Sequence, residues 1–251
     1  MRLLLVNPNT SKSFTDLIAK IADEYKNENT EIISKSPIEG PRSIESIYDE
    51  LLSSKGTLEL VIDEMEDYDG FILACYSDHP VIYALREITN KPVLGIAEAS
   101  MYMACMLGYK FSIVTTNDEW QPLLWDAVKH YGLESRCASI RSTGMAVLAL
   151  EDSEGDRSYQ LIKNAALRAL DEDGAEVICL GCAGMAGLDK RLETDINVPV
   201  IDGVVAALKF IESLAAYGAN TSKRLAYATP KEKALDGLSP IFSKVYHSNT
   251  D

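Results

Sequence analysis

The feature that most constrains the fold is a repeated alternation between short apolar runs and longer segments of helical period. This alternation is typical of βαβ units, in which parallel strands form a sheet covered by helices. It predicts an α/β protein. The predicted strands are residues 2–7, 30–35, 70–75, 92–97, 111–116, about 136–140, 176–181 and 199–203, and the predicted helices include 11–25, 43–65, 156–173 and 204–219.

The eight predicted strands divide into two similar sets of four. The third strand of each set runs into a cysteine, in "GFILACYSDHP" and "EVICLGCAGM", and the fourth strands begin alike, in "NKPVLGIAEA" and "NVPVIDGVVAA". We therefore predict two pseudo-symmetric lobes, each a four-stranded, mainly parallel sheet flanked by helices, with the active site between them. The first lobe is assigned residues 1–97 plus about 204–220, and the second lobe residues 98–203. The polar, proline-containing tail 221–251 is predicted to be disordered or to pack on a neighbouring subunit.

Composition excludes several classes of partner. The formal net charge of −14 disfavours nucleic acid and anionic membrane surfaces, which are bound by clustered Lys and Arg. The apolar run at the N-terminus is too short for a signal peptide, and no apolar stretch approaches the ~18 residues of a membrane span. Five cysteines are an odd and small number, which argues against a disulfide framework. We expect a cytoplasmic protein, or one that is also nuclear, with a small-molecule substrate.

Cys75 and Cys182 are the leading candidates for chemistry. Each follows the third strand of its set, and open α/β sheets bind ligands at the carboxyl ends of their strands. A thiol at a helix N-terminus has a lowered pKa, and each cysteine is predicted to precede a helix. If the lobes face each other, the two thiols approach one pocket from opposite sides. Such an arrangement suits removal of a proton from one face of a carbon and delivery of a proton to the other.

Three other interpretations of the cysteines stay open. A structural zinc site needs four ligands, but the chain has three histidines and a single CxxC, Cys179 to Cys182. A redox CxxC would open a helix, whereas Cys179 falls inside an apolar strand and is expected to point into the core. Cys105 and Cys137 are interpreted as small core residues. The matched positions of Cys75 and Cys182 favour catalysis, and we predict neither a metal nor a cofactor.

Polar loops beside the first strand of each set offer hydrogen-bond donors. In "NPNTS", Asn9 and Thr10 precede a helix with Ser11 as its N-cap, and Thr115 and Thr116 occupy the equivalent place in "VTTNDEW". A turn with a helix cap explains both stretches equally well. Three other stretches carry weaker signals. "GPRSIES" can carry a loop over the pocket, "GCAGMAG" lacks the spacing of a dinucleotide site, and Trp120 and Trp125 are interpreted as packing residues.

Six blocks of sequence together carry a family resemblance, which covers residues 1 to about 218. "VNPNTS", "GPRSIE", "ILACYSDHP", "FSIVTTNDEW", "ICLGCAGMAGL" and "VPVIDGVVAA" resemble the hydantoin/allantoin racemase group of the Asp/Glu racemase superfamily, and "ACYSDHP" is most similar to its fungal branch. The resemblance implies two pseudo-symmetric α/β lobes and cofactor-independent catalysis by two cysteines. Carried over, Cys75 and Cys182 form that pair and act on the stereocentre of a five-membered hydantoin-type ring.

The resemblance also implies the surroundings of the ring. Backbone N–H groups and hydroxyls after the strands would hold the enolate, and the loops of the first lobe would line the ring and its substituent. The implied substrate-binding residues are Asn9, Thr10, Ser43, Ile44, Tyr76, Ser77, Thr115, Thr116, Ala183 and Gly184. The family tends to assemble, so a homo-oligomer is expected.

The residues after the second cysteine bear on the substrate. Glutamate and aspartate racemases of the superfamily typically carry Thr-His after the second cysteine. Ala183 and Gly184 occupy those positions here and favour a neutral ring.

Two further functions remain as alternatives. Another two-cysteine isomerase, an amino-acid racemase or a maleate isomerase-like enzyme, is the nearest alternative. A non-catalytic ureide-binding regulatory protein is the other. Arylmalonate decarboxylases keep only the second-lobe cysteine, so Cys75 argues against them.

Overall fold

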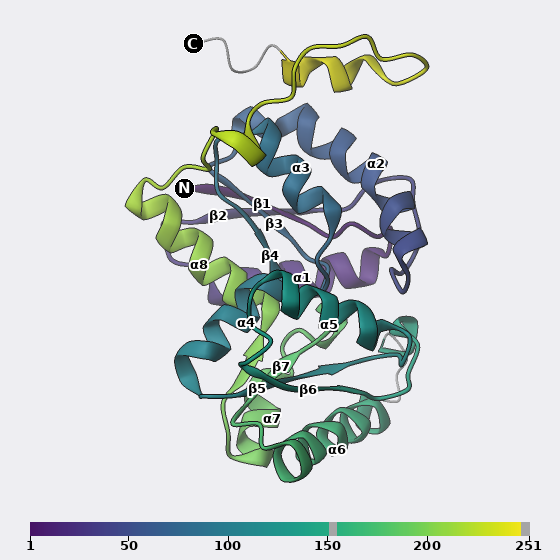
Figure 1. Cartoon of the computed structure of the whole chain (residues 1–251), viewed down its shortest axis with the longest axis vertical. Helices are drawn as coiled ribbons and strands as arrows, with labels where there is room; N and C mark the ends of the chain where they lie inside the picture. Colours follow the sequence, from purple (N-terminus) through teal and green to yellow (C-terminus); the bar gives the residue numbers. More distant parts are fainter. Residues whose placement is uncertain (151–154, 247–251) are drawn as a thin grey trace.

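The chain folds into two stacked lobes, each built on a parallel four-stranded sheet (Figure 1). The computed structural model describes residues 1–150 and 155–246, with the backbone alone at 155 and 156. The strand orders are β2-β1-β3-β4 in the first sheet and β6-β5-β7-β8 in the second, so the two sheets have the same topology. The strands are β1 (Arg2–Val6), β2 (Glu31–Lys35), β3 (Gly70–Leu73), β4 (Val93–Gly95), β5 (Phe111–Thr115), β6 (Cys137–Ser142), β7 (Val177–Leu180) and β8 (Val200–Asp202).

Helices cover both faces of each sheet. The α-helices are α1 (Lys12–Tyr25), α2 (Ile47–Glu64), α3 (Pro80–Ile88), α4 (Ile96–Leu107), α5 (Trp120–His130), α6 (Gly155–Asp173), α7 (Asp189–Ile196) and α8 (Gly203–Tyr217). The 3-10 helices are η1 (Met65–Asp67), η2 (Val147–Leu150), η3 (Ala183–Met185), η4 (Leu225–Tyr227) and η5 (Pro240–Tyr246). Ser11 caps α1 as predicted, because its hydroxyl accepts the Phe14 N–H at 3.3 Å.

The predicted α/β architecture is confirmed, and the strand boundaries differ from prediction by at most two residues. β3 ends at Leu73 and β7 at Leu180, so Cys75 and Cys182 each lie two residues beyond a strand. β4 ends at Gly95 because α4 starts directly after it. Both cysteines therefore occupy loops, where the chain can turn toward a ligand.

Strand alternation sends side chains to different cores. Leu3 and Leu5 of β1 point into a core shared by both lobes, whereas Leu4 and Val6 point to the outer face under α2 and α3. Cys179 of β7 is fully buried in the shared core, as predicted. The second lobe has its own outer core beneath α6 and α7. Because both faces of each sheet are covered, neither sheet has room for a site on its face.

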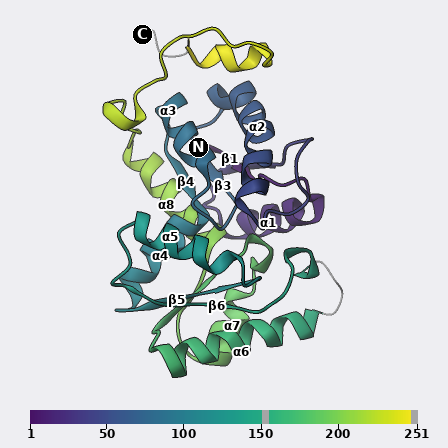
Figure 2. The same cartoon turned by 45° about the vertical axis from the view of Figure 1, so that its right-hand side comes forward.

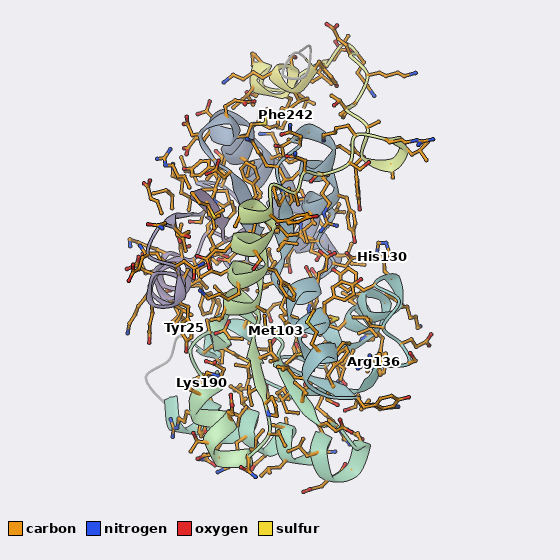
Figure 3. All side chains as sticks on the ribbon, turned by 90° about the vertical axis from the view of Figure 1, so that its left-hand side faces the viewer. Tyr25, Met103, His130, Arg136, Lys190 and Phe242 are labelled. Carbon is orange, nitrogen blue, oxygen red and sulfur yellow. The ribbon has the colours of Figure 1, made fainter. Side chains whose placement is uncertain are left out.

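The two lobes meet through α4 and α8. α4 packs against α8 and against β7 of the second sheet, and α8 returns to contact β3 and β4 of the first. Figure 3 shows Met103 of α4 at this junction, where it is partly buried against the shared core. The shared core makes the lobes one continuous unit.

Polar contacts join the lobes on the side of α5. The Asp78 carboxylate of the first lobe accepts hydrogen bonds from the Tyr131 hydroxyl at 3.0 Å and from His130, both in the second lobe. Trp120 Nε1 donates to the Tyr76 carbonyl oxygen at 3.1 Å. Figure 3 places His130 at the edge of this junction. These bonds fix the loop that follows Cys75 against the second lobe.

The described part of the C-terminal tail lies on the first lobe. η5 packs on α2, and η4 packs on α3 (Figure 2). Val245 is buried in the outer core of the first sheet. Residues 221–246 therefore contact their own chain, while contact with a neighbouring subunit stays a prediction. In the described ranges, the structure contains no helix with the length and apolar character to span a membrane.

Asp202 at the end of β8 provides a test of how the second lobe is held together. Its carboxylate accepts the Val204 N–H at 2.8 Å, which caps α8, and the Gly187 N–H at 2.8 Å. Burial raises the pKa of Asp202. The folded protein therefore binds this proton more tightly than the unfolded chain, and the resulting stability is present below the unfolded pKa of about 3.9 and is lost as pH rises through the folded pKa.

We expect Asp202→Asn to gain stability relative to the wild type as pH rises from about 4 to 7, because Asn does not ionise. Asn caps helices about as well as Asp, so the cap on α8 is kept, but the amide nitrogen cannot accept the Gly187 N–H, and this loss is expected to cost about 1–3 kcal/mol throughout. Urea unfolding across this pH range measures both effects, with Asp236→Asn at an exposed tail position as the control for charge. Identical pH slopes for Asp202→Asn and the wild type would contradict the prediction.

Candidate active site

A cavity lies between the lobes, at the carboxyl ends of both sheets. It is formed by the loops that follow β1, β2, β3, β5 and β7, as open α/β sheets predict. Its free space of about 40 Å³ is far below the roughly 300–1,000 Å³ of drug-sized ligand pockets, so the site suits a small molecule. The lining residues are Asn9, Phe14, Ile44, Ala74, Cys75, Tyr76, Thr116, Asn117, Trp120, Val147, Gly181, Cys182, Ala183 and Gly184.

The two predicted thiols both line this cavity. Cys75 comes from the first lobe and Cys182 from the second, each two residues past the equivalent strand. Their exposure differs, because Cys75 is buried and Cys182 is half-buried. The thiols are close enough for a charge on one to raise the pKa of the other. The structure thus brings the two sequence-predicted cysteines to one site from opposite lobes.

The ionisation of the two thiols differs from the sequence-based expectation. Burial raises the pKa of Cys75 strongly, and the nearby Glu50 adds to the increase. Burial also raises the pKa of Cys182, to about 11. The expected lowering by a helix N-terminus is wrong for both, because α3 begins five residues after Cys75 and only the short η3 follows Cys182.

Local donors oppose this desolvation at each thiol. The Ser77 hydroxyl donates to Cys75 Sγ at 3.4 Å, which favours the thiolate. At Cys182, the backbone N–H groups of Gly184 and Met185 lie close enough to the thiol to lower its pKa, and the Met185 N–H itself donates to the Cys182 carbonyl oxygen at 3.0 Å. Cys182 is therefore the thiol that ionises more readily, and its donors are supplied by the turn that begins η3.

Six of the ten predicted binding residues line the cavity. Asn9 reaches it from the loop after β1, where its side-chain oxygen accepts a hydrogen bond from Asn7 Nδ2 at 2.9 Å. Tyr76 also lines the cavity, and its hydroxyl hydrogen-bonds Ser100 at 2.8 Å. The full set is Asn9, Ile44, Tyr76, Thr116, Ala183 and Gly184.

The other four predicted binding residues lie outside this lining. The Thr10 hydroxyl donates to the Pro41 carbonyl, and the Ser43 hydroxyl donates to Glu45. Thr115 is fully buried and donates to the Gly181 carbonyl at 3.3 Å. Ser77 lies behind Cys75 and contacts its sulfur. Thr10, Ser43 and Thr115 therefore stabilise loops, and Ser77 contacts the Cys75 thiol.

Sequence reasoning missed several lining residues. Trp120 was expected to pack, and it does so while also presenting its ring to the cavity. Phe14 and Val147 add apolar surface from α1 and η2. Asn117 belongs to the same loop as Thr116, which is the one signal that pointed to it. Val147 carried no signal, because η2 lies in a segment with no recognisable motif.

Glycine at two positions is required by close packing around Cys182. A side-chain carbon at Gly181 would meet the Val114 carbonyl oxygen at 2.8 Å, and one at Gly184 would meet Phe14 and Leu150 at 2.9 Å. Small residues let the Cys182 loop approach the neighbouring chain closely. Their spacing in "GCAGMAG" thus reflects packing and exposure of backbone donors.

Among the residues that the structure describes, none of those lining the cavity carries a charged side chain. Glu45 comes near from the loop after β2, but its carboxylate is engaged by Ser43 and, from the second lobe, by Asn117 Nδ2 at 3.1 Å. His79 is also unavailable, because its Nδ1 accepts the Val81 N–H and its Nε2 contacts Ser53. The two thiols are thus the acid–base groups that face a ligand.

Comparison with known proteins agrees with this fold and shows the family. The family model described as Asp/Glu/Hydantoin racemase matches residues 3–211. A hydantoin racemase of Pseudomonas sp. (strain NS671) is 42% identical over 97% of this chain and 98% of its own length. An allantoin racemase from Klebsiella pneumoniae superposes with a TM-score of 0.92 at 41% identity, covering 98% of both chains. A fungal relative, an uncharacterised protein of Schizosaccharomyces pombe, is 38% identical over 90% of this chain and 97% of its own length.

The unequal burial of the thiols predicts unequal reactivity. We expect iodoacetamide to modify Cys182 before Cys75, because Cys182 is more exposed and its pKa is less strongly raised. The rate at Cys182 should rise about tenfold per pH unit below about pH 11, since thiolate is the reacting form. Mass spectrometry of each cysteine-containing peptide over time measures both. Faster modification of Cys75 would contradict the assignment, and the fully buried Cys179 serves as an unreactive reference.

Proposed function

Because the chain belongs to the Asp/Glu/hydantoin racemase family, we propose that it racemises a five-membered hydantoin-type ring by two-base proton transfer between Cys75 and Cys182. Allantoin is the first candidate substrate, and 5-substituted hydantoins are the second. The observation that carries the proposal is the placement of two thiols from opposite lobes on one uncharged cavity.

Each step of this reaction has a group to perform it. One cysteine, as thiolate, takes the proton from the ring stereocentre, and its S–H bond forms as the C–H bond breaks. The electron pair moves into the adjacent carbonyl to give an enolate. The other cysteine, as thiol, then delivers its proton to the opposite face of the carbon. The two thiols exchange protonation states, so the mirror-image reaction uses the same groups in reverse order.

Backbone donors support the enolate. Ala183, Gly184 and Thr116 line the cavity together with Cys182, and their backbone N–H groups and the Thr116 hydroxyl are the donors we assign to this role. Such donors stabilise a developing oxyanion most effectively where water is excluded. Asn9 supplies a side-chain amide from the opposite lobe, where it can contact a ring carbonyl or N–H group.

The uncharged lining supports a neutral ring over an amino acid. An amino acid carries an ammonium and a carboxylate, and their burial without charged partners is costly. The cavity lining contains no such partner among the described residues. A hydantoin offers a proton that is acidic enough for a thiolate, because its carbon lies beside a carbonyl and carries nitrogen.

The direct test uses enantiopure allantoin and purified protein in D2O. We expect the circular dichroism signal to decay far faster than in a control without enzyme, with loss of the C5–H proton signal in the NMR spectrum as deuterium enters. The control is needed because allantoin racemises slowly by itself. If allantoin shows no acceleration, a panel of 5-substituted hydantoins is tested. Failure of every ring would reject the racemase and favour a ureide-binding regulatory protein.

Single substitutions test the two-base scheme. We expect Cys75→Ser and Cys182→Ser each to lower racemisation by about 10²–10⁴-fold, the usual contribution of a positioned acid or base. Each variant should still exchange the ring proton of one enantiomer with solvent, through the thiolate that remains. Cys179→Ser, at a buried position away from the cavity, is the matched control. Near-normal racemisation by either catalytic variant would overturn the scheme.

A further inference from the structure

A two-base racemase leaves its thiols in exchanged protonation states after each net conversion. To convert a second molecule of the same enantiomer, one thiol must lose a proton and the other must gain one. Cys182 is half-buried and can exchange with solvent directly. Cys75 lines the same cavity but is more deeply buried, so a second path for its proton, separate from the cavity that holds the substrate, would speed its return to the starting state. This inference rests on the proposed function and concerns how the protonation state of Cys75 is restored, or reset, between turnovers.

A second cavity lies directly behind Cys75. It holds about 310 Å³ and shares Trp120 with the lining of the first cavity, while Ser77 lines the second cavity. Glu50 of α2 lines it from the first lobe, and Asp126 and His130 of α5 line it from the second. The side chains of Asp126 and His130 are 75% and 57% exposed, which places this cavity at the solvent surface.

Ser77 connects Cys75 with this second cavity. Its hydroxyl donates to Cys75 Sγ at 3.4 Å, and Ser77 and Glu50 line the second cavity together, where Ser77 is close enough to the Glu50 carboxyl group to lower its pKa. Both Ser77 and Glu50 are buried, with 4% and 8% exposure. The order of groups is therefore Cys75, Ser77, Glu50 and then the second cavity.

Glu50 is held firmly in this position. Its backbone carbonyl accepts hydrogen bonds from the Ser53 hydroxyl at 2.9 Å and from the Ser54 hydroxyl. Burial raises the pKa of Glu50, so its carboxyl group can carry a proton closer to neutral pH than an exposed glutamate does. His79 is nearby, but its ring nitrogens bond Val81 and Ser53, so it does not take part.

We propose that Ser77 and Glu50 form a proton relay that joins Cys75 to solvent through the second cavity and resets the free enzyme between turnovers. To reprotonate Cys75, the Glu50 carboxyl O–H bond breaks as its proton passes to Ser77 Oγ. The Ser77 proton moves to the Cys75 thiolate, and solvent reprotonates Glu50. To deprotonate Cys75, the same three transfers run in reverse. Glu50 is thus a positioned relay group that does not touch the substrate.

The relay predicts a specific kinetic signature. Net conversion of an enantiopure substrate at saturation requires the free enzyme to be reset after every turnover. Exchange of a label between the two enantiomers in a racemic mixture does not, because each enantiomer restores the protonation state that the other needs. The ratio of net conversion to label exchange, measured on one preparation, therefore reports resetting and is independent of the fraction of protein that is folded.

We expect Glu50→Gln and Ser77→Ala each to lower this ratio by about tenfold or more, as loss of a positioned proton donor usually does. In Glu50→Gln, kcat from the enantiopure substrate should fall more than kcat/KM, because resetting is not limiting at low substrate concentration. Glu59→Gln is the matched control: it makes the same charge change on the same helix, where Glu59 pairs with Lys55. The control should keep the wild-type ratio.

The outcomes separate the two proposals. If the wild type racemises its substrate and Glu50→Gln retains the wild-type ratio, the relay is wrong and the proposed function stands. An equal fall in net conversion and label exchange in Glu50→Gln would also overturn the relay, because it would indicate a structural role. If the wild type racemises no hydantoin, the proposed function fails and the relay fails with it.

Discussion

Burial of both faces of each parallel sheet is the constraint on which the rest of this structure depends. Helices cover each face, so the residues of β1, β3, β5 and β7 are almost all inside a core. A sheet packed in this way exposes its backbone only where its strands end. The same strand order in both lobes places the loops after β3 and β7 at equivalent edges. The candidate active site therefore lies where the two lobes meet.

Neutrality of the site stands out in so acidic a chain. The formal net charge is −14, yet the described residues around the catalytic cavity contribute thiols, amides, hydroxyls and apolar groups. Three carboxylates lie just outside the cavity lining. Glu45 and Asp78 accept hydrogen bonds from the second lobe, and Glu50 lies near Ser77. Glu50 disfavours the thiolate form of Cys75 and Glu45 that of Cys182, so donors from the ligand and the backbone must supply much of the stabilisation of the charged form.

Much of the fold and the two thiols could be predicted from the sequence, because their signals are local and periodic. The apolar runs and helical segments gave the eight strands, and the repeat of a cysteine after the third strand gave the pair. The contacts of Thr10, Ser43 and Thr115 could not be predicted. A Ser or Thr in a loop after a strand gives the same sequence pattern whether its hydroxyl faces a ligand or a neighbouring backbone or side-chain acceptor. The placement of Val147 and of Glu50 depends on how α2, η2 and the lobes pack, which no local pattern records. The expected lowering of the thiol pKa values is wrong, because burial raises the pKa of each thiol more than a helix N-terminus several residues away can lower it.

The unequal surroundings of the two thiols carry a thermodynamic consequence. Mirror-image molecules have equal free energies in water, so for the proposed racemisation the equilibrium constant is one and kcat/KM must be the same in both directions. A buried Cys75 and a half-buried Cys182 nevertheless present different environments to the two hands of the ring. The asymmetry must then be divided between binding and turnover, so that the enantiomer held more tightly is the one converted more slowly. The site therefore cannot favour one direction of racemisation, but it can bind one enantiomer more tightly than the other.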